Sequence, residues 1–135
     1  MAIDHAKLIE ALNESDPGVQ WFADIKLQTV RKVSLQDPQG IERFKRDMAA
    51  DAKRFVQIPK KTGTDRYAEL QGFIKIVADK ALAAKLTDAL SSPAPYREFR
   101  LLLERKAKEK RQFDNYLKSC SQKRLENFLK VTHLG

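Results

Sequence analysis

The amino-acid sequence predicts an α+β fold with a small three-stranded antiparallel sheet, an N-terminal helix and a helical C-terminal half. Residues 19–35 alternate apolar and polar side chains, which is typical of strands, and a short apolar run over 54–58 stops at Pro59. From residue 65 onward apolar side chains recur every three or four residues, as helices require. The 135 residues are 42% hydrophobic and 33% charged. We therefore expect a single domain over 1–135, with a mixed part (1–59) and a basic helical part (60–135).

The chain begins with a predicted short helix and a hairpin. Asp4 is a candidate N-cap for a helix of about ten residues, which the turn-forming run over 15–18 ends. In the next segment Val19, Trp21 and Ala23 alternate with Gln20, Phe22 and Asp24, so the two sets point to opposite faces of a predicted strand. A second strand contains Val30 and Val33. We expect the hairpin to turn near residues 25–28, although no Asn-Gly or Asp-Gly pair specifies its type.

A second helix and a third strand complete the mixed part. Asp37 followed by Pro38 is an N-cap with proline at the first helical position, and the apolar spacing extends the helix to about residue 53. Phe55, Val56 and Ile58 then form a short strand that Pro59 ends, since proline cannot donate to a sheet ladder.

The basic part is predicted to contain a series of helices. Thr64 or Asp65 caps the first, Asp79 starts the next, and the Ser-Ser-Pro-Ala-Pro run over 91–95 separates it from the following stretch.

The stretch over 93–129 carries most of the positive charge of the chain. Between residues 97 and 124 there are ten Lys or Arg and four Asp or Glu, in a chain whose net charge is +8. Its apolar pattern lapses over 104–112, so either one helix continues or the chain bends near 106–109, and we favour the bend.

The order of these features resembles that of the small bacterial proteins grouped as the uncharacterised protein family UPF0158. The likeness is carried by RFVQIPK, DRYAELQGFIKIVAD, LAAKLTDAL and YREFRLLLER, with Phe113 and Tyr116 after them, and by LIEAL before the first strand. Phe113 stands where such proteins usually have tryptophan, and the stretch is basic where they are often acidic. The resemblance implies an α+β fold and no assigned activity.

The residues do not favour an enzyme. His5 and His133 lie near the two ends of the chain, no Cys, His and Asp cluster has metal spacing, and neither GxGxxG nor GxxxxGK[ST] occurs. We expect no metal and no cofactor.

Cys120 is the only cysteine and lies on an apolar helical stripe, which favours a buried thiol and a reducing compartment. No apolar run reaches the roughly 18 residues of a membrane span, and no signal core is present, so a cytoplasmic protein without a membrane partner is expected.

A net positive charge favours an anionic partner, either nucleic acid or an acidic protein. The leading hypothesis is nucleic-acid or polyanion binding, in which cations contact phosphates and release counterions. Its candidate residues are Lys60, Lys61, Arg97, Arg100, Arg105, Lys106, Lys108, Lys110 and Arg111. For Lys60 and Lys61, which precede a helix N-terminus, a plain solvated loop is the competing interpretation. Phe99, Phe113 and Tyr116 could stack on bases, but their helical spacing favours core packing.

The competing hypothesis is a protein-interaction or adaptor domain, with Trp21 and Phe22 or a sheet edge as the partner contact and the charge as a solvated surface. The two hypotheses differ in their dependence on salt, because phosphate binding weakens steeply as salt rises and an apolar interface scarcely responds. The sequence leaves the ligand and the oligomeric state open.

Overall fold

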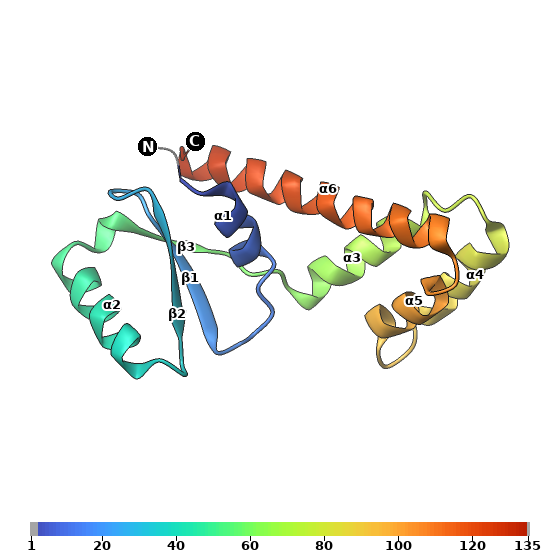
Figure 1. Cartoon of the computed structure of the whole chain (residues 1–135), viewed down its shortest axis with the longest axis horizontal. Coiled ribbons are helices and arrows are strands. Elements are labelled where there is room, and N and C mark those ends of the chain that lie inside the picture. The colour runs from blue at the N-terminus through green and yellow to red at the C-terminus, as the bar shows by residue number, and fades with distance from the viewer. Residues whose placement is uncertain (1–2, 135) are drawn as a thin grey trace. The chain divides into compact units, whose positions relative to one another are not determined.

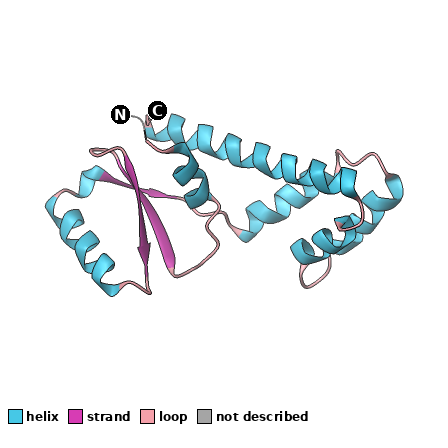
Figure 2. Cartoon of the chain, viewed as in Figure 1, coloured by secondary structure: helices cyan, strands magenta, loops and turns pink. Residues whose placement is uncertain are grey.

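The computed structural model describes residues 3–134 and has the predicted α+β fold (Figures 1 and 2). The first elements are α1 (His5–Leu12), β1 (Val19–Asp24), β2 (Thr29–Ser34), α2 (Pro38–Ala50), the 3-10 turn η1 (Ala52–Arg54) and β3 (Phe55–Ile58). The helices α3 (Gly63–Ile74), α4 (Lys80–Ala89), α5 (Pro95–Leu103) and α6 (Ala107–Thr132) follow. Helix α2 is thus shorter than the predicted 38–53, because Asp51 leaves the helical conformation, with φ −157° and ψ 85°, and residues 52–54 form the separate turn η1.

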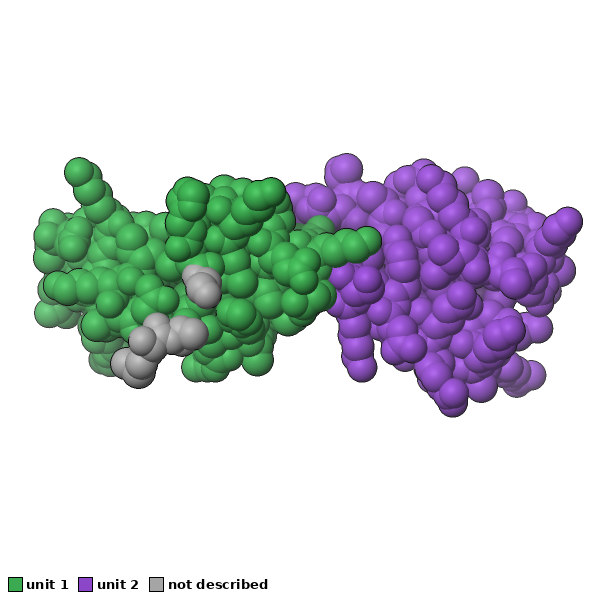
Figure 3. Space-filling model, turned by 90° about the horizontal axis from the view of Figure 1, so that it is seen from above, with its two compact units in different colours: residues 1–61, 121–135 green, residues 62–120 purple. Residues whose placement is uncertain are grey.

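The chain divides into two compact units, coloured separately in Figure 3. The first unit contains residues 1–61 and 121–135, and the second contains residues 62–120. The boundary after Lys61 lies close to the expected change at residue 59. The last fifteen residues, which we had grouped with the helical part, belong to the first unit because their apolar side chains join the core beside the sheet.

The sheet has the order β2-β1-β3, with both pairs antiparallel. The hairpin between β1 and β2 turns over residues 25–28, as predicted, and Gln28 takes the positive φ of 56° that the turn needs. Asp24 stabilises this turn, since its carboxylate accepts hydrogen bonds from the amides of Lys26 and Leu27 at 3.1 and 3.0 Å.

One face of the sheet forms the core of the first unit. Val19, Trp21 and Ala23 of β1 are buried there, which confirms the period-two alternation. They pack in one cluster with residues from α1 and from the end of α6, including Leu8 and Leu125. Helix α1 therefore covers this face together with the C-terminal end of α6, and Figure 1 shows α1 beside the sheet.

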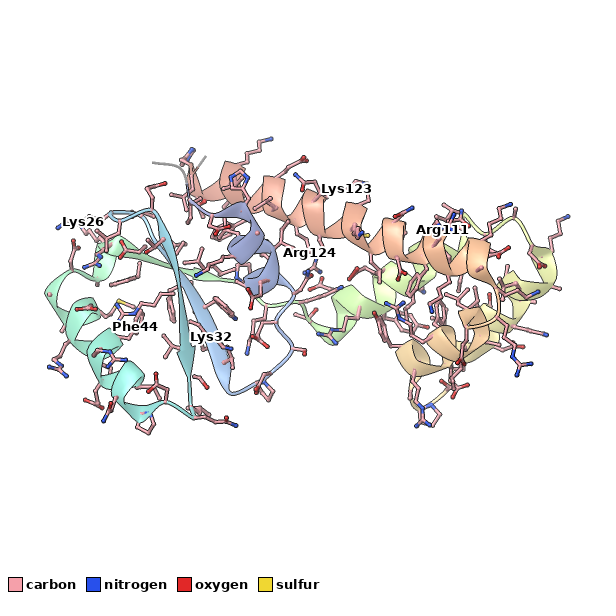
Figure 4. All side chains as sticks on the ribbon, in the orientation of Figure 1. Lys26, Lys32, Phe44, Arg111, Lys123 and Arg124 are labelled. Carbon is pink, nitrogen blue, oxygen red and sulfur yellow. The ribbon has the colours of Figure 1, made fainter. Side chains whose placement is uncertain are left out.

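The other face of the sheet is covered by α2. Phe44 is the buried residue of this helix, and its ring lies 4.4 Å from that of Phe22 and 5.0 Å from that of Phe55. Arg31 lies over the Phe44 ring at 5.2 Å and is ion-paired with Asp47. Aromatic packing and one ion pair thus hold α2 on the sheet. Figure 4 shows Phe44 between α2 and the strands.

The second unit has a helical core of its own. Phe73 of α3, Leu86 of α4, Phe99 of α5 and Phe113 of α6 are each 0% exposed and belong to one cluster. The ring of Phe113 lies 4.8 Å from that of Phe73 and 6.1 Å from that of Phe99. Residues 62–120 bury their apolar stripes against one another, because four amphipathic helices supply enough apolar surface for a cluster of their own.

Candidate nucleic-acid interface

The outer face of α6 in the second unit carries three cations and one asparagine in a row, which we call the α6 basic stripe and define as Lys108, Arg111, Asn115 and Lys118. All four residues are exposed. Their spacings of three and four residues place them on one side of the helix, and Phe113 lies on the opposite, buried side. Lys108, Arg111 and Asn115 also line a shallow surface hollow together with Gln112. Figure 4 marks Arg111 on this part of α6.

Gln112 connects the stripe to the rest of the second unit. Its side-chain amide lies 3.4 Å from the carbonyl oxygen of Ile76, in the segment that joins α3 to α4. The Phe113 ring beneath it is held by Phe73 and Phe99. The stripe is therefore carried by a helix that is packed into the core of the second unit.

Two further cations, Arg105 and Lys106, lie in the turn just before α6. The turn covers residues 104–106, so the chain does bend in the basic stretch, slightly earlier than the expected 106–109, and α5 and α6 are two helices. Both cations are exposed. A continuous helix would have paired Glu104 with Lys108 and Arg105 with Glu109. Neither ion pair forms within residues 3–134, because residues 104 and 105 are not helical.

These cations keep their charge available to solvent. Among the described residues none engages the side chain of any of the following six in a hydrogen bond or ion pair: Arg105, Lys106, Lys108, Lys110, Arg111 and Lys118. Lys110 is exposed but lies two residues after Lys108, about 200° around the helix, and so projects away from the stripe. Arg97 is exposed on α5.

Arg100, another candidate, is occupied by the chain itself. Its guanidinium donates to Asp114 at 2.9 Å and to the Tyr96 hydroxyl at 3.0 Å, and it lies over the Phe113 ring at 4.9 Å. Burial lowers the pKa of Arg100, but the hydrogen bonds to Tyr96 and Asp114 raise it more, so the pKa lies above its ordinary value. Arg100 therefore joins α5 to α6 and is not a free phosphate ligand, which corrects its assignment to the anion site.

The loop before α3 does not form a cradle for an anion. Lys60 donates to the carbonyl oxygens of Asp16 and Val19 at 3.1 and 2.9 Å, which fixes the segment before β1. Thr62 is the N-cap of α3 and forms a capping box with Asp65, whereas Thr64 or Asp65 had been expected as the cap. Lys61 is half-buried. Lys60 and Thr62 are thus held by contacts within the chain, whereas the competing interpretation had expected a plain solvated loop.

Trp21 and Phe22 are also engaged internally. Trp21 is 5% exposed, and its indole N–H donates to Glu14 at 2.9 Å. This hydrogen bond is the main reason why the pKa of Glu14 lies below its ordinary value. Phe22 packs against Phe44 of α2. Neither ring is presented as a contact surface for a partner, which corrects their assignment as partner contacts, because core packing of β1 and the cover of α2 occupy both faces.

The sequence interpretation missed two members of the stripe. Lys118 was counted in the basic stretch but not among the candidate site residues, and Asn115 was not considered. The signal was the spacing of 108, 111, 115 and 118, which follows one helical face across the stretch. The interpretation had instead grouped cations by nearness in sequence to the expected bend.

Among residues 3–134, no three His, Cys, Asp or Glu side chains lie close enough to hold a metal ion. None of the described helices has the length and apolar character to cross a membrane. Cys120 is half-buried, close to Tyr116, whose pKa is raised by burial and further by Cys120 and Glu69.

The comparisons with known proteins identify a family and add no activity. Neither the comparison with curated proteins nor that with solved structures found a match. A family model described as Uncharacterised protein family (UPF0158) matches residues 1–135, the whole length of the chain. The family that its residues resemble is thereby shown, and the chain belongs to the Uncharacterised protein family (UPF0158).

Proposed function

We propose that this protein is a non-enzymatic nucleic-acid-binding protein of the bacterial cytoplasm, which contacts phosphates through the α6 basic stripe. The observation that carries the proposal is the row of Lys108, Arg111 and Lys118 on one exposed helical face, with no carboxylate among its members. Arg105 and Lys106, exposed in the turn before α6, add to the same local field.

The electrostatics of the second unit support this proposal. Asp114 is the acid nearest in sequence to the middle of the stripe, and its charge is taken up by Arg100. A surface that served only solubility would be expected to mix both signs of charge. Three cations that follow one face without an acid between them match an extended anion better than an isolated carboxylate.

The magnitude of the effect follows from counterion release. Three phosphate contacts predict that the logarithm of the association constant falls with the logarithm of salt with a slope of about −2.7 for B-form DNA. Participation of Arg105 and Lys106 would steepen the slope to about −4.5. Between 50 and 200 mM salt the three contacts alone correspond to a loss of affinity of about 40-fold.

The test is fluorescence anisotropy of labelled DNA and RNA with the full chain, titrated at several salt concentrations. The test variant carries Lys108→Gln, Arg111→Gln and Lys118→Gln, since glutamine keeps the helix propensity and removes the charge. The control variant carries Lys7→Gln, Lys26→Gln and Lys53→Gln, three exposed lysines of the first unit, and removes the same net charge.

We expect salt-dependent binding that the stripe variant loses and the control variant keeps. An equal loss in the two variants would show that only net charge matters and would refute the assignment to the stripe. Absence of binding at about 50 mM salt would refute the proposed function and would favour the adaptor hypothesis, with a protein partner whose binding responds little to salt.

A further inference from the structure

We infer that the preferred ligand of the α6 basic stripe is a double-stranded nucleic acid and not a single strand. This inference rests on the proposed function and names the ligand class of that same site. It follows from two properties of the second unit: where its aromatic side chains lie, and the length and rigidity of the stripe.

Proteins that bind single strands combine cations with exposed aromatic rings, on which bases stack with about 1–3 kcal/mol each. The basic segment of this chain contains rings, but they face inward. Phe99 and Phe113 are 0% exposed. Tyr116 lies on the inner side of α6, with its ring 5.9 Å from that of Phe73.

Tyr96 is the exposed ring of this segment, at 41%. The Arg100 guanidinium lies 5.3 Å from its centroid and donates a hydrogen bond to its hydroxyl. A base could stack on Tyr96 only by displacing Arg100, which is also paired with Asp114. Among residues 96–118 the structure thus presents cations without a free stacking surface beside them.

The stripe is also straight, because it belongs to a continuous α-helix. From Lys108 to Lys118 the helix rises about 15 Å, at about 1.5 Å per residue. A B-form duplex carries one phosphate charge per about 1.7 Å of axis, so about nine phosphates lie along the same length. A single strand is flexible and must be ordered along the row, which costs conformational entropy. Without stacking to offset that cost, the duplex is the better ligand.

The expected difference can be stated as a ratio of affinities. Three contacts predict salt slopes of about −2.7 for a duplex and about −2.1 for a single strand. If the two lines meet near 1 M salt, the difference corresponds to about sixfold tighter binding of the duplex at 50 mM salt.

The experiment measures anisotropy of a 20-base-pair DNA duplex and of each of its two strands, with the wild-type chain, the stripe variant and Tyr67→Ala. Tyr67 of α3 is included because it is 41% exposed and is the ring in the second unit, outside the basic segment, that a base could reach. An RNA duplex and its strands form a second series.

Tighter binding of the duplex, with the steeper slope and a loss in the stripe variant, is the expected result. Equal or tighter binding of the single strands would overturn this inference and leave the proposed function standing, and a loss of that binding in Tyr67→Ala would identify the stacking ring. Absence of binding to every probe would overturn the proposed function itself.

Discussion

Replacement of Gly72 by alanine tests whether α3 and α6 pack as closely as described. A Cβ atom at this position would lie 2.0 Å from the Tyr116 hydroxyl oxygen and 3.2 Å from its Cζ atom. Within a helix, alanine is favoured over glycine by about 1 kcal/mol. Forcing an extra carbon into a packed interface costs about 1–3 kcal/mol, and the upper part of that range applies here because the obstructing atom ends a rigid ring. We expect Gly72→Ala to lower the free energy of unfolding by about 1–2 kcal/mol.

The same helix offers a matched control in Gly63, where an added Cβ would meet nothing within 4 Å. Gly63→Ala should therefore leave stability unchanged or raise it by up to about 1 kcal/mol, because alanine restricts the unfolded chain. Tyr116→Phe removes the obstructing hydroxyl, so the double variant Gly72→Ala with Tyr116→Phe should recover most of the loss.

The assay is urea unfolding followed by circular dichroism at 222 nm, with the four proteins compared at one pH. The reasoning would be refuted if Gly72→Ala proved as stable as the wild type or more so. It would also be refuted if Tyr116→Phe failed to rescue it, since the cost would then not come from the hydroxyl contact.

Two further predictions concern the first unit. Burial raises the pKa of Asp24, but hydrogen bonds from Arg54 and the Leu27 amide lower it more, so the pKa lies below its ordinary value. The stabilisation by this carboxylate is therefore present above the unfolded-state pKa of about 3.9 and is lost as the pH falls through the folded-state value. Asp24→Asn should cost about 1.5–3 kcal/mol at pH 7 in urea unfolding, with a difference from wild type that shrinks below about pH 4, and a difference independent of pH would contradict the assignment. Phe44→Ala should cost about 3–5 kcal/mol and speed amide hydrogen exchange in α2, because Phe44 is the residue that this helix buries. Unchanged exchange would show that α2 is held by other contacts.

Most of the local structure could be predicted because its causes are close in sequence. Asp4, Asp37 and Asp79 each accept a hydrogen bond from an amide three residues later, so each helix start is specified within one turn. The face of β1 that enters the core follows from alternation alone. The end of β3 follows from Pro59.

The sequence-based predictions of helix boundaries were wrong where several neighbouring residues could serve equally well as the boundary. Thr62, Thr64 and Asp65 all carry side chains that can cap a helix. The choice of Thr62 depends on a reciprocal pair of hydrogen bonds, in which the Thr62 hydroxyl accepts from the Asp65 amide and the Asp65 carboxylate accepts from the Thr62 amide. The position of the bend between α5 and α6 likewise could not be located within two residues, because the residues around it are all helix-compatible.

The sequence by itself determined the fold class, the positions of the strands and most helices, and the concentration of positive charge near α6, since propensity, capping and periodicity act over a few residues. Only the tertiary structure decided which cations are held by other groups of the chain and which remain available to a ligand. Arg100 and Lys60 looked equivalent to Lys108 in the sequence, yet the first is held by Asp114 and Tyr96 and the second by two carbonyl oxygens. Such partners lie 4 to 44 residues away along the chain, so packing alone brings most of them together. Tertiary packing also decided that the chain forms two compact units, because the sequence pattern shows which faces are apolar but not which of them pack together.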